Sequence, residues 1–318
     1  MPIFNTENVR YFLKKLKSSS SGPDQLSPQL LKAAHLEIDE VLARLFNSCI
    51  SNSYVPTQFK FANITPIPKV SNPTKALDYR PIANLAALDK VFQRVIVQYI
   101  LKITSAFWND NSQFGFLPGR NTMDAIIQVI EDWSKAKDLK QPTLAIFFDF
   151  EKAFDLVDHS ILLTKIAKYL PQWLISWIAA YLTERKQRVK IGEIKAEWKN
   201  VEAGVIQGSV IGPILFIIFI HDINEYLPPG IDLVKYADDI LSYLIGNFDV
   251  HLPQEIVNGI SKWCEVNKMK LNTNKCKVMV INHQQPKIIL NGIELEVIDD
   301  YKYLQIPTRS SRINNGKK

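Results

Sequence analysis

Cysteine and histidine are scarce in this chain. Three of its 318 residues are cysteines, Cys49, Cys264 and Cys276, and none forms a Cys-x-x-Cys pair. An odd number of widely spaced cysteines does not indicate a disulfide scaffold. The five histidines are scattered and show no metal-ligand spacing. We therefore expect a protein of a reduced compartment without a structural zinc site.

Long apolar runs are also lacking. The most apolar stretch, residues 210–220, contains Gly212 and Pro213 and ends at His221, well short of the roughly 20 residues that cross a bilayer. It is typical of a buried helix. The amino terminus lacks the basic and then apolar pattern of a secretory signal, and no fixed-period repeat is visible. We expect an intracellular protein with no membrane partner.

The composition is that of a globular protein with an excess of basic residues. Hydrophobic residues make up 47% of the chain and charged residues 22%, which excludes disorder and fibrous repeats. A chain of 318 residues can form about two lobes. The net charge of +6 favours a polyanionic partner such as a nucleic acid.

Hydrophobic periodicity predicts a mixed α/β fold. Residues 143–148 are a short apolar run typical of a strand buried on both faces, and Asp149 follows it directly. Residues 233–243 place β-forming residues on both sides of Asp238-Asp239, which predicts a hairpin with the acids at its tip. Further strands are expected at 188–192, 277–281 and 287–290, and helices at 30–46, 89–100 (capped by Asp89), 162–170, 173–178 and 253–267.

The three acids suit one kind of chemistry if they meet at one edge of a sheet. Two metal ions about 3.5–4 Å apart can activate an attacking oxygen and hold a leaving group during phosphoryl transfer. Mg²⁺ prefers oxygen ligands and commonly uses one or two carboxylates together with substrate phosphates. The alternative is that Asp238-Asp239 is ordinary turn chemistry, because aspartate favours turns.

The order of motifs decides between these readings, because it resembles reverse transcriptases of non-LTR (LINE-type) retrotransposons. The resemblance extends from Ser21 to Leu304 and rests on segments in the family's order: Ser21-Gly22-Pro23-Asp24, Tyr79-Arg80-Pro81-Ile82, Gln113 to Arg120 (QFGFLPGR), Phe148 to Asp155 (FDFEKAFD), Gln207 to Pro213 (QGSVIGP), Tyr236-Ala237-Asp238-Asp239 and Leu271 to Lys275 (LNTNK).

This resemblance implies a right-hand polymerase fold of α/β (α+β) class, with an antiparallel-sheet palm. We expect an amino-terminal helical extension of the fingers at 1–60, fingers at 61–142, a palm with a primer-grip-like end at 143–308, and a polar tail at 309–318. The family continues after this point into a helical thumb, so the sequence suggests a carboxyl-terminally truncated chain whose thumb is largely absent.

The resemblance also implies the site residues. Asp149 and Asp238 would bind two Mg²⁺ ions, or Mn²⁺, and Asp239 would complete the acidic site. Bound cations relieve the repulsion among three such anions. The partners implied are an RNA template, a DNA primer and deoxynucleoside triphosphates.

Phe154 stands where the family carries an aromatic residue beneath the sugar of the incoming nucleotide. A bulky ring there would clash with a 2′-hydroxyl, so Phe154 favours deoxynucleotides. RNA-dependent RNA polymerases of similar layout carry a polar acid at this position. The alternative reading is a core aromatic on a helix that follows the strand.

The remaining nucleotide contacts are implied in the same way. Gly208 permits close backbone approach, and Ser209 can cap the following helix. Ile206 replaces the family's usual proline. The residues expected to contact the incoming nucleotide, besides Phe154, are Gln207, Gly208, the basic Lys69 and Arg80 over the triphosphate, and Lys275 near the leaving pyrophosphate as a general acid.

Two functions from different classes follow. The first is RNA-directed DNA polymerase activity, weak and distributive in a truncated chain. The second is a catalytically silent nucleic-acid-binding relic, and an RNA polymerase with a similar palm is a further enzymatic alternative.

The sequence departs from the family at Gln305, where a glycine is expected, and at His221, where asparagine is common.

Overall fold

The structure of the chain is a computed structural model. It describes residues 3–18, 20–105, 108, 112–231, 233–304 and 306–309, with the backbone alone at 300, 302 and 306–309. The predicted polar tail beyond residue 309 and the departure at Gln305 lie outside these residues. No helix in the described ranges is long and apolar enough to span a membrane.

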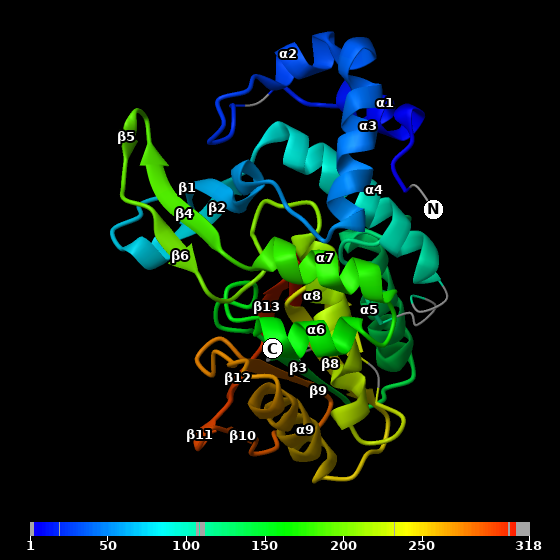
Figure 1. Cartoon of the computed structure of the whole chain (residues 1–318). Helices are drawn as coiled ribbons and strands as arrows, with labels where there is room; N and C mark the ends of the chain where they lie inside the picture. Colours follow the sequence, from blue (N-terminus) through cyan, green and yellow to red (C-terminus); the bar gives the residue numbers. More distant parts are fainter. Residues whose placement is uncertain are drawn as a thin grey trace. The chain divides into compact units, whose positions relative to one another are not determined.

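The chain divides into two compact units, each made of two separate stretches (Figure 1). Unit 1 comprises residues 1–107 and 157–219, and unit 2 comprises 108–156 and 220–318. The predicted lobe boundaries at 60, 142 and 308 stay predictions.

Unit 1 combines helices with one sheet. Its elements are α1 (Thr6–Lys14), α2 (Pro28–Ala33), α3 (His35–Ser51), η1 (Thr57–Lys60), β1 (Phe61–Pro68), η2 (Ala76–Asp78), β2 (Tyr79–Asn84), α4 (Ala87–Ile103), α6 (His159–Ile166), α7 (Gln172–Leu182), β4 (Arg185–Ile191), β5 (Ile194–Lys195), β6 (Lys199–Val201) and α8 (Gly212–Ile220), which ends at the boundary.

The sheet of unit 1 has the order β2-β1-β4-β5, and β6 pairs with β4. β1 is antiparallel to β2 and parallel to β4. Its inner face packs against Ile206 through Ala62, Ile64 and Ala83. Aromatic rings link the helices, because Phe92 on α4 lies with its ring centroid 4.9 Å from that of Trp177 on α7.

Unit 2 is built around the strand predicted to precede Asp149. Its elements are α5 (Thr122–Asp138), β3 (Thr143–Phe148), η4 (His221–Tyr226), β7 (Leu233–Tyr236), β8 (Asp239–Ile245), α9 (Leu252–Val266), β9 (Lys277–Ile281), β10 (Ile289–Leu290), β11 (Ile293–Glu294), β12 (Glu296–Ile298), β13 (Asp300–Tyr303) and β14 (Ile306–Arg309). The main sheet has the order β12-β9-β3-β8-β7, and every residue of β3 is buried.

Three expectations from the sequence need correction. Asp89 does not cap a helix, because α4 begins at Ala87 with Ala86 as N-cap, and the carboxyl of Asp89 is fully buried inside its first turn. The helix predicted at 30–46 is broken after Ala33 into α2 and α3. The strand predicted at 287–290 is only the two-residue β10.

Candidate active site

Asp149 and Asp239 meet across two neighbouring strands of unit 2. Phe148 at the end of β3 pairs with Ile240 in antiparallel β8, so the next residues along, Asp149 and Asp239, stand opposite each other. Directly opposed residues of an antiparallel pair have Cβ atoms roughly 4.5–5.5 Å apart. Asp239 also pairs with Tyr236 of β7, which leaves Ala237 and Asp238 as the turn. The structure thus brings all three acids to one edge of the sheet.

The charges of these acids reach Tyr301 on β13. The Tyr301 ring stacks on Phe147 of β3, with ring centroids 4.0 Å apart. Burial, followed by the negative charges of Asp149 and Asp239, raises the pKa of Tyr301 to about 12. A deprotonated phenol next to two carboxylates would be strongly unfavourable. Tyr301 therefore stays neutral beside the acids.

The turn that carries Asp238 is held by Gln113. Ala237 adopts a φ of 58°, a left-handed conformation that non-glycine residues rarely adopt. The amide oxygen of Gln113 accepts hydrogen bonds from the backbone N–H groups of Ala237 (3.2 Å) and Gly115 (2.8 Å). A Cβ on Gly115 would lie 2.7 Å from the Ala237 nitrogen, so only glycine allows this close approach. Gln113 and Gly115 fix the turn in its strained form.

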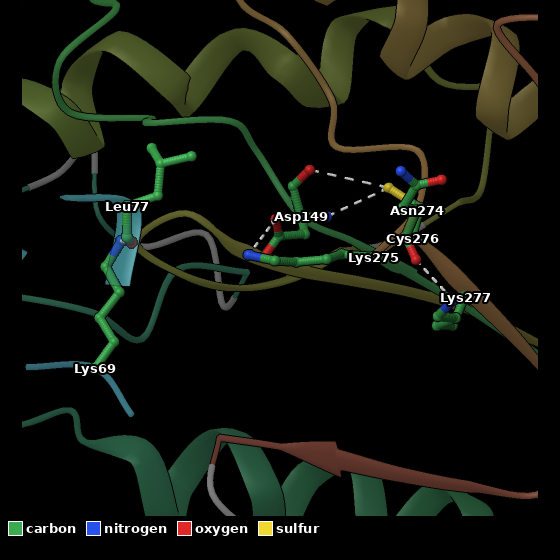
Figure 2. A network of polar contacts seen from close by, with 7 residues as sticks. All are labelled: Lys69, Leu77, Asp149, Asn274, Lys275, Cys276 and Lys277. Carbon is green, nitrogen blue, oxygen red and sulfur yellow. Dashed lines mark hydrogen bonds and ion pairs between the residues drawn. The ribbon is translucent and has the colours of Figure 1, made fainter. Parts of the chain in front are cut away.

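The loop before β9 surrounds Asp149 on its other side (Figure 2). The Asp149 N–H donates to Cys276 Sγ at 3.4 Å. The Asp149 carbonyl accepts from the Asn272 N–H at 2.8 Å. Lys275 Nζ lies 3.3 Å from Asp149 Oδ2. Burial raises the pKa of the Cys276 thiol to about 11, so this sulfur stays protonated at neutral pH. The sequence contained no signal for the role of Cys276.

The donor set at this edge suits a hard divalent cation. Oδ2 of Asp149 is buried and accepts no hydrogen bond from the residues that the structure describes, although Lys275 offsets part of its charge. Within the described ranges, no three His, Cys, Asp or Glu side chains are arranged to hold a metal on their own. Mg²⁺ accepts one or two protein carboxylates when substrate phosphates supply the remaining oxygens. Asp149 and Asp239 therefore fit a metal that arrives with its substrate.

Phe154 lies in the same unit as the acids, but not on a helix. Residues 151–156 form turns, and the Phe154 side chain is half-buried. Its ring meets that of Phe116 edge-on, with centroids 6.4 Å apart. Phe116 has a φ of 62° and is 44% exposed. The alternative of a core aromatic on a following helix is therefore wrong in its secondary structure.

The other predicted nucleotide contacts belong to unit 1. Lys69 and Arg80 are exposed on the β1–β2 hairpin, where Lys69 Nζ donates to the Leu77 carbonyl at 3.1 Å (Figure 2). The Gln207 carbonyl accepts from the Ala83 N–H at 2.7 Å. Gly208 has a φ of 102°, and a Cβ there would lie 2.6 Å from the Ala83 carbonyl oxygen. Gly208 therefore allows close backbone approach to strand β2, and its predicted contact with the nucleotide stays a prediction.

The segment after Gly208 is fixed by two side chains. Ser209 Oγ accepts from the Gly212 N–H at 2.9 Å, which confirms its predicted role at the start of α8. The Gln93 amide oxygen on α4 accepts from Val210 N (2.7 Å) and Ile211 N (3.1 Å). Sequence reasoning missed Gln93, because a glutamine in mid-helix carries no local signal for such a contact.

Comparison with protein families gives one match over most of the chain. The family model described as "Reverse transcriptase (RNA-dependent DNA polymerase)" matches residues 67–305. This range contains Asp149, Asp238 and Asp239. The chain belongs to the reverse transcriptase family. The resemblance drawn from the sequence motifs is confirmed.

Retrotransposon proteins are among its relatives. The chain is 29% identical over 320 residues to the RNA-directed DNA polymerase from mobile element jockey of Drosophila melanogaster, with 94% of this chain and 34% of that protein covered. It is 31% identical over 247 residues to the probable RNA-directed DNA polymerase from transposon X-element of the same fly, covering 75% and 27%. This reverse transcriptase chain thus spans about a third of the length of such relatives.

Solved structures show the same fold in telomerases. The telomerase of Candida albicans aligns with a TM-score of 0.53 at 14% identity, covering 92% of this chain and 57% of that one. The telomerase of Candida tropicalis gives 0.52 at 14% identity, covering 91% and 56%. The predicted right-hand polymerase fold of mixed α/β class is confirmed by this likeness.

Proposed function

We propose that this reverse transcriptase chain adds deoxynucleotides to the 3′ end of a DNA primer on an RNA template. The observation that carries the proposal is the register of β3 and β8, which sets Asp149 opposite Asp239 with Asp238 in the adjoining turn. Family membership over residues 67–305 supports the choice of reaction.

The three acids and Lys275 have different proposed roles at this edge of the sheet. Asp149, Asp238 and Asp239 would hold two Mg²⁺ or Mn²⁺ ions, which supply activation of the primer hydroxyl and stabilise charge on the transferring phosphate. Lys275 Nζ, 3.3 Å from Asp149 Oδ2, offsets part of the charge of the acids. On arrival of a triphosphate, it can protonate the leaving pyrophosphate as a general acid.

Five further residues are assigned to nucleotide binding. Phe154 would pack under the sugar and reject a 2′-hydroxyl. Lys69 and Arg80 would neutralise the triphosphate, since each is exposed and basic on one hairpin. Gln207 and Gly208 would contact the nucleotide and template, supported by the anchoring of their backbone to β2.

The test is primer extension with Asp149→Asn. Purified protein is given a DNA primer annealed to RNA, deoxynucleotides and Mg²⁺ or Mn²⁺, and primer-template binding is measured in parallel. We expect Asp149→Asn to abolish synthesis and to retain most binding. Asp138→Asn, which changes an exposed aspartate at the end of α5, is the matched control and should extend like the unchanged chain.

Two other outcomes would sink the proposal. Binding without extension in every variant would identify a silent nucleic-acid-binding protein. Preferential incorporation of ribonucleotides would identify an RNA polymerase. For the sugar contact, Phe154→Val should raise the use of ribonucleotides relative to deoxynucleotides by roughly 10- to 200-fold.

A further inference from the structure

One face of the sheet in unit 1 gathers basic side chains from three strands. Residues opposed across a ladder share a face, and so do residues two apart along a strand. Arg188 on β4 stands opposite Asn63 on β1, and Lys190 stands opposite Lys195 on β5. The same alternation places further residues on this side, which we call the basic sheet face: Arg80, Lys186, Arg188, Lys190 and Lys195, together with Phe61 and Trp198.

Acidic residues are absent from all five strands of this sheet, which the structure describes in full. The acids of the hairpin segment, Glu193 and Glu197, lie outside its strands. None of the five cations of the basic sheet face forms an ion pair with a carboxylate of the described residues. The opposite face has a different role, since Ala62, Ile64 and Ala83 pack there against the core.

Lys190 and Lys195 form a like-charged pair directly across the ladder. Such pairs destabilise an antiparallel ladder, and an anion bound between them removes the repulsion. The β4–β5 hairpin that carries them extends beyond β1 and β2 (Figure 1). On the basic sheet face itself Lys195 is exposed and Lys190 is half-buried, so this end of the sheet is open to a ligand.

A stacked cation lies in the middle of the same face. The Arg188 guanidinium lies 4.2 Å from the centroid of the Trp198 ring, and the Phe61 ring meets Trp198 edge-on at 4.7 Å. Arg188 Nε also donates to Asn63 Oδ1 at 3.0 Å. These contacts fix a planar, charged group before any ligand binds, and planar groups of this kind stack on unpaired bases.

We propose that the basic sheet face binds single-stranded RNA, with phosphates at Lys186, Lys190 and Lys195 and a base stacked at the Arg188–Trp198 pair. Identification of the strand as template RNA rests on the proposed function. An unpaired strand fits better than a duplex, because stacking requires a base that has left its own helix.

The first test measures binding of a fluorescein-labelled 12-nucleotide single-stranded RNA by anisotropy at several salt concentrations. Lys186→Ala is compared with Lys199→Ala, because both lysines are exposed on paired strands but lie on opposite faces. Lys186→Ala should weaken binding and lower the slope of log affinity against log salt by about 0.7. Lys199→Ala should change neither. Equal effects of the two variants would overturn the proposal.

Two further variants keep the test independent of folding. Lys195→Glu should raise Tm, because it replaces a repulsive pair with an attractive one opposite Lys190, and it should weaken RNA binding. Trp198→Ala should weaken single-stranded RNA binding by roughly 5- to 150-fold and leave duplex RNA binding unchanged. Unchanged RNA affinity in both variants, or losses confined to duplex RNA or to single-stranded DNA of the same sequence, would contradict the proposal.

Primer extension separates this inference from the proposed function. If the unchanged chain extends no primer but Lys186→Ala and Trp198→Ala still weaken RNA binding selectively, the basic sheet face stands and the proposed activity fails. If the chain extends primers while these variants bind RNA as Lys199→Ala does, the activity stands and the inference fails.

Discussion

The side chain of Gln113 positions the turn of the β7–β8 hairpin, which carries Asp238. Its amide oxygen accepts from both Gly115 and Ala237, so Gln113→Ala frees a turn that is held in a strained conformation. A displacement of about 1 Å near reacting atoms can cost about 100-fold in rate. We expect Gln113→Ala to lower kcat by that order with little change in KM, measured by primer extension under single-turnover conditions.

Gln113→Glu provides the matched control for this prediction. A carboxylate oxygen can accept the same two backbone N–H groups, so this variant should recover most of the lost rate. Equal losses in both variants, or a loss expressed in KM, would show that Gln113 does not act through the turn.

Asp89 makes stability depend on pH. Burial raises the pKa of its carboxyl from 3.8 to about 6, against the opposing charges of Arg185 and Lys90. Between these values the folded chain binds more protons than the unfolded one, so the free energy of unfolding falls as pH rises. Relative to Asp89→Asn, the unchanged chain should lose about 2 kcal/mol between pH 4 and pH 7.

Urea unfolding of both chains between pH 4 and pH 7.5 measures this difference. Asp24, whose pKa is also raised by burial, is present in both chains. Comparison of the two chains therefore isolates Asp89. If the two chains gave parallel curves of unfolding free energy against pH, Asp89 would not be the source of this pH dependence.

At the scale of elements, Gly208 joins the loop before α8 to strand β2. An added Cβ there would meet the Ala83 carbonyl oxygen at 2.6 Å, whereas one on Gly192 would have no atom within 4 Å, although both glycines have positive φ. Gly192→Ala thus carries only the conformational cost. Gly208→Ala adds overpacking of roughly 1–3 kcal/mol. We therefore expect Gly208→Ala to lose more unfolding free energy than Gly192→Ala by that amount, measured by urea unfolding. Equal losses in the two variants would contradict this prediction.

Elements with a strong local pattern were predictable from the sequence. β3 is an uninterrupted apolar run, the β7–β8 hairpin has its acids at the turn, and α9 has clear helical spacing. Asp89 was misassigned because an acid near a helix start is usually a cap, and only the packed structure reveals its burial. The parallel pairing of β1 with β4 was also beyond local patterns, since Asn63 and Arg188 are 125 residues apart.

The candidate site also has features that the sequence predicts and features that it does not. The motifs around Asp149 and Asp238-Asp239 located the acids, and strand alternation explains why they share an edge. The contacts of Gln93, Gln113 and Cys276 depend on segments brought together by tertiary folding. A sequence read residue by residue contains no signal for the geometry of these hydrogen bonds.

At the scale of the whole molecule, each compact unit depends on both halves of the chain. Residues 1–156 contain β3 but lack β8 and β9, its two partners in the sheet. They also contain α4 but lack Trp177 and Val210, which contact Phe92 and Gln93 on that helix. Neither half can bury its apolar strands and helices without the other.

We therefore expect fragments 1–156 and 157–318 to remain unfolded when each is expressed alone. Without its partners, β3 would expose all six of its residues, which the intact sheet buries. Exposed, largely apolar strands of this kind aggregate. Co-expression of the two fragments should restore the near-ultraviolet circular dichroism of the intact chain and a cooperative thermal transition. A cooperative transition of fragment 1–156 by itself would contradict this view, because it would require β3 and α4 to be stable without the partners that pack against them.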